Sequence, residues 1–286
     1  PASDLNKIKY HLVPHLYSKQ ENQAELDRGI LFYISSIFYL ISSIVVALNL
    51  SRKIKFDFII SYHIIPQAFF AFFTSRLISI PYIVSQTGIM IEKQILSYKS
   101  LNYILLRHIL KKALMINVPG SESKKFWTKM GLDSYKINLL HSTVDINKFH
   151  PIKKDKIFDI IFVGRLDWYK YVELLIFSVK YITMKDIKIK VAIVGNGPYS
   201  HLFQRLVNDL NLKSNIELLG FRKDLPDLLN TSRFFYICSK TEGLPTALME
   251  AMSCGVVPLV SNVGNMPSIV KDNVNGFIVR KLNIES

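Results

Sequence analysis

The sequence has little cysteine, with only two such residues among 286. Cys238 and Cys254 form no CxxC pair and have no histidine at a metal-ligand spacing, so a disulfide framework is excluded and a zinc site has no support. The chain also lacks an H-E-x-x-H pattern and a G-x-S-x-G motif. Neither a zinc hydrolase nor a serine hydrolase of the elbow type is therefore expected.

Acidic residues are scarce as well. The chain has 22 acidic residues against 36 Lys and Arg, a formal net charge of +14 that leans towards the first half. Such a balance favours anionic partners, namely phosphorylated ligands, acidic membrane surfaces or nucleic acid. The basic residues between 107 and 129 cluster without an RNA-binding aromatic motif. We therefore expect no nucleic-acid partner, and an anionic lipid surface explains the cluster better.

No secretory signal is recognisable, which makes the cytoplasm the default location. The chain opens on Pro1 instead of Met, and we expect it to be part of a longer protein. Residues 29–51 carry no charge and are long enough to span a bilayer, which takes about 20 apolar residues. Serines and Asn49 dilute this segment, which favours a buried or interfacial helix, although a membrane span stays open.

The 49% of hydrophobic residues and 20% of charged residues predict a globular chain, and its length predicts two domains. From Phe56 onward, short apolar runs alternate with helical patterns, as in parallel α/β sheets. Expected strands are 58–61, 82–85, 114–118 and 137–140, then 157–163, 191–194, 216–219, 234–238, 256–260 and 277–279. A polar stretch, 145–156, separates the two series and is the expected linker. We predict two doubly wound, Rossmann-like α/β domains, 1–150 and 151–286, facing each other across a cleft.

The most informative segment, 239–255, follows the expected strand 234–238. Pro245 suits the first helical position and Gly255 the residue just past the helix end. Glu242 then lies in the loop before the helix and Glu250 on the helix, so both carboxylates can border one cleft. Backbone N–H groups at this helix N-terminus favour phosphate. The alternative is that both acids are solvated surface residues.

Two further segments also follow expected strands. In residues 162–170 a strand ends at Gly164, and Arg165 and Lys170 follow, two cations that suit a diphosphate unless they are solvated surface charges. In residues 194–198 a glycine-rich turn precedes a helical pattern, but Ser200 occupies the third glycine position of a dinucleotide fingerprint. NAD binding is therefore disfavoured.

Taken in this order, the three segments resemble the donor domain of family-4 (group 1) glycosyltransferases, which have the GT-B fold. The matching pieces are Gly164-Arg-Leu166 with Lys170, Gly195-Asn-Gly-Pro198, and Glu242-Gly-Leu-Pro245 through Glu250. The resemblance is strong over 157–279 and thinner before that, where family members begin with a strand and a glycine-rich loop that are not recognisable here. It implies a chain truncated at both ends.

The resemblance implies a retaining glycosyltransferase that moves a sugar from a nucleotide-diphosphate sugar to a glycan or lipid-linked acceptor in cell-surface polysaccharide synthesis. It implies no metal and no cofactor besides the nucleotide-sugar substrate. The basic, apolar first half of the chain leads us to expect a lipid-linked acceptor and a cytoplasmic enzyme at the inner face of a membrane. The implied catalytic residues are Arg165, Lys170 and Glu242. The implied donor-binding residues are Gly164, Gly195, Asn196, Gly197, Pro198, Arg222, Gly243, Leu244, Pro245, Thr246 and Glu250. The implied acceptor-side residues are His63, Thr87 and Gly88.

The sequence departs from the family pattern at several positions. Thr87 stands where a His often precedes the glycine, Tyr171 replaces the Gly expected after Lys170, and Ser268 replaces a Glu often found after Pro267. These departures keep two alternatives open. One is a non-catalytic GT-B-like subunit that binds a nucleotide sugar, and the other is a nucleotide-sugar epimerase of the same fold.

Overall fold

The computed structural model describes residues 30–86, 101–141 and 143–280. The chain divides into two compact units, residues 1–86 with 99–117 and residues 87–98 with 118–286. The elements form two sheets, one of four strands and one of six, and every strand pair with a defined register is parallel. This architecture confirms the predicted α/β fold with parallel sheets.

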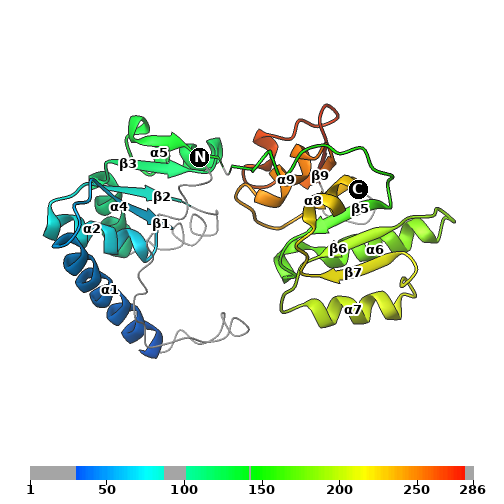
Figure 1. Ribbon diagram of the computed structural model, residues 1–286, viewed down its shortest axis with the longest axis horizontal. Coiled ribbons are helices and arrows are strands. Elements are labelled where there is room, and N and C mark those ends of the chain that lie inside the picture. The colour runs from blue at the N-terminus through cyan, green and yellow to red at the C-terminus, as the bar shows by residue number, and fades with distance from the viewer. Residues whose placement is uncertain (1–29, 87–100, 142, 281–286) are drawn as a thin grey trace. The chain divides into compact units, whose positions relative to one another are not determined.

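The four-stranded sheet has the order β1-β2-β3-β4. Its strands are β1 (Ile59–Tyr62), β2 (Tyr82–Ser85), β3 (Met115–Val118) and β4 (Ile137–Leu139). The helices of this part of the chain are α1 (Ile30–Ser51), α2 (Gln67–Ile78), α4 (Leu101–Lys112) and α5 (Ser121–Lys129). Helix α1 packs along α2, and α2 packs against β1 and β2 (Figure 1). Within the described residues, no helix is both long enough and apolar enough to cross a membrane.

The six-stranded sheet has the order β10-β9-β8-β5-β6-β7. Its strands are β5 (Phe158–Val163), β6 (Val191–Val194), β7 (Ile216–Gly220), β8 (Ser232–Ile237), β9 (Val257–Ser261) and β10 (Phe277–Val279). The helices between them are α6 (Val172–Thr183), α7 (Ser200–Asp209), α8 (Leu225–Asn230) and α9 (Thr246–Ser253). The strand series 5-6-7 runs one way from β5 and the series 8-9-10 runs the other way, which makes the sheet doubly wound.

Both faces of this sheet are buried. Alternate residues of one strand enter different cores, because successive side chains of a strand point to opposite faces. Ile161 packs in the core under α8 and α9, whereas its neighbour Phe162 packs in the core under α6 and α7. Phe235 and Tyr236 divide in the same way. This two-sided burial explains why the strands read as continuous apolar runs in the sequence.

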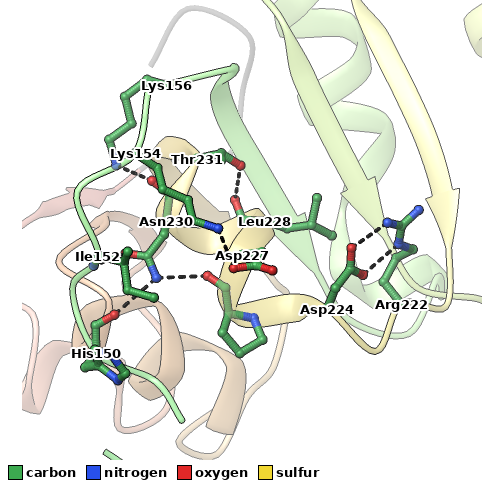
Figure 2. A network of polar contacts seen from close by, with 11 residues as sticks. His150, Ile152, Lys154, Lys156, Arg222, Asp224, Asp227, Leu228, Asn230 and Thr231 are labelled. Atoms are coloured by element: carbon green, nitrogen blue, oxygen red, sulfur yellow. Dashed lines mark hydrogen bonds and ion pairs between the residues drawn. The ribbon is translucent and has the colours of Figure 1, made fainter. Parts of the chain in front are cut away.

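The expected linker is an extended segment held by one side chain. Asn230, at the end of α8, is 1% exposed. Its Oδ1 accepts the backbone N–H of Ile152 at 2.7 Å, and its Nδ2 donates to the carbonyl oxygens of His150 and Pro226 at 3.1 and 2.9 Å (Figure 2). The Lys156 ammonium adds bonds to the carbonyls of Asn230 and Ser232, each 2.9 Å long. The segment is therefore fastened to the β7–β8 connection.

Candidate active site

The strand order reverses between β5 and β8, which are hydrogen-bonded neighbours. In doubly wound sheets, ligands bind outside the carboxyl ends of the strands at such a reversal. The loop after β5 begins at Gly164 and leads through a short 3-10 helix, Trp168–Lys170, into α6. The loop after β8 leads from Cys238 into α9. These two loops carry the candidate site.

Lys170 and Glu242 meet at this point. Lys170 Nζ forms an ion pair with Glu242 Oε1, and the two side chains are only 12% and 10% exposed. Ser239 Oγ donates a second hydrogen bond to the same carboxylate oxygen at 2.8 Å. Two residues 72 positions apart are thus joined in one partly buried cluster.

Ser261, at the end of β9, fixes the backbone of Ser239. The backbone N–H of Ser239 donates to Ser261 Oγ at 3.0 Å, and Ser261 Oγ donates to the carbonyl oxygen of Ser239 at 2.9 Å. Ser239 and Ser261 are 0% and 1% exposed. The backbone N–H of Lys240 donates to the carbonyl oxygen of Tyr169 at 2.8 Å, so the loops after β5 and β8 are also joined directly. The hydrogen bonds form a continuous path from β9 to the ion pair.

The backbone after Lys170 turns sharply. Tyr171 has φ 47° and ψ 41°, the left-handed conformation that favours glycine. This explains why glycine is expected here and shows that tyrosine adopts the same backbone conformation. The Tyr236 hydroxyl donates to the Tyr171 carbonyl oxygen at 3.1 Å. The turn that brings Lys170 to Glu242 is therefore held from β8.

The turn 195–198 needs its glycines because two loops lie in backbone contact. A Cβ on Gly195, whose φ is +135°, would lie 1.8 Å from the carbonyl oxygen of Gly164. A Cβ on Gly197 would lie 2.1 Å from the carbonyl oxygen of Leu166. The Leu166 N–H donates to the carbonyl oxygen of Asn196 at 3.0 Å. The predicted G-x-G-P turn therefore borders the loop that carries Arg165 and Lys170.

Arg165 lies in that loop, with a side chain 45% exposed and its Nε 3.3 Å from Asp167 Oδ2. Tyr169 lies near both groups of charges. Burial raises the pKa of the Tyr169 phenol, Asp167 and Glu242 raise it further, and Arg165 opposes them. Arg165 thus pairs with the carboxylate of Asp167, while its side chain remains exposed to solvent.

Helix α9 matches its prediction closely. Leu248 and Ala251 are buried, and Gly255 follows the helix with φ +75°. Pro245 lies one position earlier than expected, as the N-cap before Thr246, because its ψ of 128° is extended instead of helical. Glu250 lies beside the buried stripe and is half-buried. Burial raises the pKa of the Glu250 carboxyl, and the positive charge of Lys148 opposes that shift.

The remaining candidates fall in several places. Gly243 accepts the N–H of Asn265 at 2.9 Å, and Leu244 is buried. Arg222, after β7, forms two hydrogen bonds with Asp224, one of them 2.8 Å long (Figure 2). His63 follows β1, is exposed, and has a φ of 77°. Thr87 and Gly88 lie outside the described residues.

Sequence reasoning missed Ser239, Ser261, Tyr169 and Tyr236. Ser239 and Ser261 each stand at or directly after the carboxyl end of a strand, and this position was the available signal. Serine is common at such positions for many reasons. The hydrogen bonds between Ser239 and Ser261 therefore could not be predicted without knowing that β8 and β9 are neighbours in the sheet.

A family model described as glycosyl transferases group 1 matches residues 144–286, which is half of the chain. The chain belongs to the group 1 glycosyltransferases. An Escherichia coli relative, UDP-Gal:alpha-D-GlcNAc-diphosphoundecaprenol alpha-1,3-galactosyltransferase, is 32% identical over 182 residues, 58% of this chain and 47% of that protein. An uncharacterised glycosyltransferase of Methanocaldococcus jannaschii is 24% identical over 98% of this chain and 78% of its own length.

Solved structures agree with the fold of this group 1 glycosyltransferase. Anabaena HepE in complex with UDP has a TM-score of 0.73 at 17% identity, over 85% of this chain and 69% of that chain. Sucrose-phosphate synthase from Thermosynechococcus elongatus has a TM-score of 0.71 at 16% identity, over 93% of this chain and 70% of that chain. This chain spans about half the length, or slightly less, of the first curated relatives that it matches.

Proposed function

We propose that this chain carries the catalytic site of a retaining glycosyltransferase that moves a hexosyl group from a nucleotide-diphosphate sugar to a glycan or lipid-linked acceptor. The observation that carries the proposal is the Lys170–Glu242 pair at the reversal of strand order between β5 and β8. Similar proteins add support. The name of the E. coli relative gives UDP-Gal as its donor, and HepE was solved with UDP.

Cleavage of the bond between sugar and diphosphate leaves positive charge on the ring and adds negative charge to the leaving oxygens. Lys170 and Arg165 would stabilise the leaving diphosphate together with backbone N–H groups at the start of α9, because charge that develops in the transition state is stabilised most by fixed charges and dipoles. These cations supply the positive charge for the leaving group, so we propose transfer without a metal. A transfer rate that is unchanged by a chelator would support this, and loss of transfer would contradict it.

The other candidates divide between the ends of the donor. Glu242, fixed by Lys170 and Ser239, would hold hydroxyls of the transferred sugar together with the backbone at Gly243. Glu250 would accept hydrogen bonds from the ribose, and the turn 195–198 would border the nucleotide.

Substitution of Lys170 tests the catalytic assignment. Lys170→Ala should lower kcat/KM by at least about 100-fold, since the loss of one group that stabilises developing charge typically costs about 2.7 kcal/mol or more. Lys188→Ala is the matched control. It removes an exposed lysine from the connection between α6 and β6 and should leave kcat/KM unchanged. Turnover of Lys170→Ala close to that of the wild type would remove this residue from the mechanism.

Donor binding and chemistry are separated by two further measurements. A thermal-shift panel of UDP-, GDP- and ADP-sugars should identify the nucleotide, because a ligand at 100 times its Kd adds about 2.7 kcal/mol to the stability of the folded state. NMR of the product should then show the anomeric configuration of the donor retained. Binding without transfer would favour a non-catalytic subunit, and an altered free nucleotide sugar without acceptor would favour an epimerase.

We further propose that the enzyme works at the inner face of a membrane, as a peripheral protein of cell-surface polysaccharide synthesis. The name of the E. coli relative supports this, because it gives a diphosphoundecaprenol acceptor. Transfer to a lipid-diphosphate acceptor presented in vesicles tests the proposal, and a preference for a soluble acceptor would contradict it.

A further inference from the structure

Helix α1 presents an apolar stripe to solvent. Ile37, Ile41 and Val45 recur every four residues, so they lie on one side of the helix, and they are 58%, 56% and 49% exposed. Ser43, by contrast, is 4% exposed, and α1 packs along α2 (Figure 1). Ile44 is partly buried, so the helix is apolar on its packed side and also on its exposed side, whereas an ordinary surface helix exposes polar residues.

The stripe leads to a basic turn at the C-terminal end of α1. Arg52, Lys53 and Lys55 are all exposed, and among the described residues no ion pair joins any of them to an acid. Together they line a hollow of about 840 Å³. Its apolar lining includes Leu48 of α1 and Leu77 of α2, which is 60% exposed. Asp57 is the one acid among the lining residues of this hollow.

This combination fits one kind of partner better than others. Aliphatic side chains beside exposed cations match the boundary between lipid tails and anionic headgroups, where apolar residues enter the acyl region and Lys and Arg stay at the phosphate level. A protein partner would have to supply acids for three cations and an apolar strip along the helix. An anionic bilayer supplies both over any length.

We propose that α1 and the turn Arg52–Lys55 form the surface by which this protein lies on an anionic membrane, with α1 parallel to the bilayer plane. Ile37, Ile41 and Val45 would enter the acyl boundary, and lipid phosphates would occupy the basic hollow. The inference rests on the proposed function, because a lipid-linked acceptor is presented at a membrane surface.

Vesicle flotation of the whole chain tests this surface. The protein should float with vesicles that contain phosphatidylglycerol and remain unbound with phosphatidylcholine alone. The triple variant R52Q/K53Q/K55Q should bind roughly 100-fold more weakly, since each Lys or Arg near an anionic surface contributes about fivefold. The control K188Q/K190Q/K213Q removes three exposed charges from the other unit and should float like the wild type.

The apolar stripe is tested by I41S/V45S, which should lose binding while the basic turn is intact. If I41S/V45S floats like the wild type, the apolar stripe has no role in binding. If R52Q/K53Q/K55Q floats like its control K188Q/K190Q/K213Q, the basic turn has no role. Bound protein that resists extraction at alkaline pH would show that α1 spans the bilayer. Loss of a wild-type dimer in I41S/V45S, without flotation of either protein, would show that the stripe joins two copies of the chain.

The thermal shift with the donor separates this inference from the proposed function. The variants R52Q/K53Q/K55Q and I41S/V45S should keep the wild-type shift with the nucleotide sugar, because their substituted residues lie outside the unit that carries Lys170 and Glu242. Absence of a donor shift in the wild type would contradict the proposed function while leaving the flotation result intact.

Discussion

At the scale of single residues, the candidate site depends on a hydrogen-bonded path instead of on one ion pair. Glu242 Oε1 accepts from both Lys170 and Ser239, and Ser239 is in turn fixed by Ser261. A carboxylate with two donors on one oxygen keeps a defined orientation, while its other oxygen remains for a ligand. Ser239 is therefore a positioning residue.

Ser239→Ala should lower kcat/KM by about tenfold, because a hydrogen bond to a charged group contributes about 1.5 kcal/mol. The buried site loses only one oxygen atom, so we expect the melting temperature to change little. Steady-state kinetics with thermal unfolding checks this, and Ser214→Ala is the control for an exposed serine. A fall in stability with unchanged kcat/KM would assign Ser239 a structural role alone.

The sequence suggests that Lys170 and Glu242 lie close together, but it does not predict the surrounding ion pairs and hydrogen bonds. Both residues follow apolar runs, and the carboxyl ends of neighbouring parallel strands lie at one edge of a sheet. The ion pair of Arg165 with Asp167 and the link from Ser261 to Ser239 depend on rotamers and on sheet order, which a single sequence does not specify.

At the scale of elements, α6 begins with a carboxylate in an unfavourable place. Oε2 of Glu173 is buried and has no hydrogen-bond partner. It lies beside a pocket lined mainly by side chains of α6 and α7, among them Phe177 and Leu206. Burial raises the pKa of the Glu173 carboxyl, so the folded protein holds this proton at a higher pH than the unfolded chain does. The contribution of Glu173 to stability is therefore greatest in acid and is lost as the pH rises through the folded-state pKa.

Glu173→Gln should remove this pH dependence. The variant should be more stable than the wild type by about 0.5–1 kcal/mol near neutral pH, a value reduced from the full cost of an unsatisfied polar group because the residue is only half-buried. The difference should shrink towards about pH 4, where the carboxyl is protonated in both states. Chemical unfolding across this pH range is the measurement. A variant that is less stable at neutral pH would show that Glu173 has a favourable partner.

The extended segment before β5 illustrates what composition predicts and what it misses. Pro151 and the charged run 153–156 indicate a linker, and the segment has no helix or strand. Composition does not reveal that Asn230, 78 residues after Ile152, satisfies the backbone of this segment (Figure 2). Strand positions, by contrast, were predicted to within two residues. In the six-stranded sheet the reason is that strands buried on both faces have continuous apolar sequences.

Asn230→Ala should destabilise the protein by about 2–3 kcal/mol, since it removes three part-buried hydrogen bonds, each of which contributes about 1 kcal/mol. Asn230→Asp is the matched variant. It keeps the acceptor for Ile152 but loses the donor to His150 and Pro226, so an intermediate loss is expected. Denaturant unfolding of the three proteins checks the order. Equal stability of the wild type and Asn230→Ala would show that water replaces these bonds without cost.

At the scale of the whole molecule, the chain consists of two compact units with separate buried residues. Leu106, Ile109 and Ile116 are buried in one unit, whereas Phe162 and Phe235 belong to the two cores of the six-stranded sheet in the other. All the residues proposed to bind the donor lie in this second unit. Chain length and the two strand series predict two domains, 1–150 and 151–286, because each series must bury its own faces.

Ligand binding should therefore stabilise only part of the molecule. We expect two calorimetric transitions, of which UDP raises one, because a ligand stabilises only the unit whose folded state binds it. At 100 times the Kd of UDP, the gain of about 2.7 kcal/mol corresponds to a shift of roughly 5–10 °C for a unit of this size. Lys170→Ala should greatly reduce the shift and leave the other transition unchanged. A single transition that moves as a whole would show that the two units unfold together, and a shift of the other transition alone would place nucleotide binding outside the six-stranded sheet.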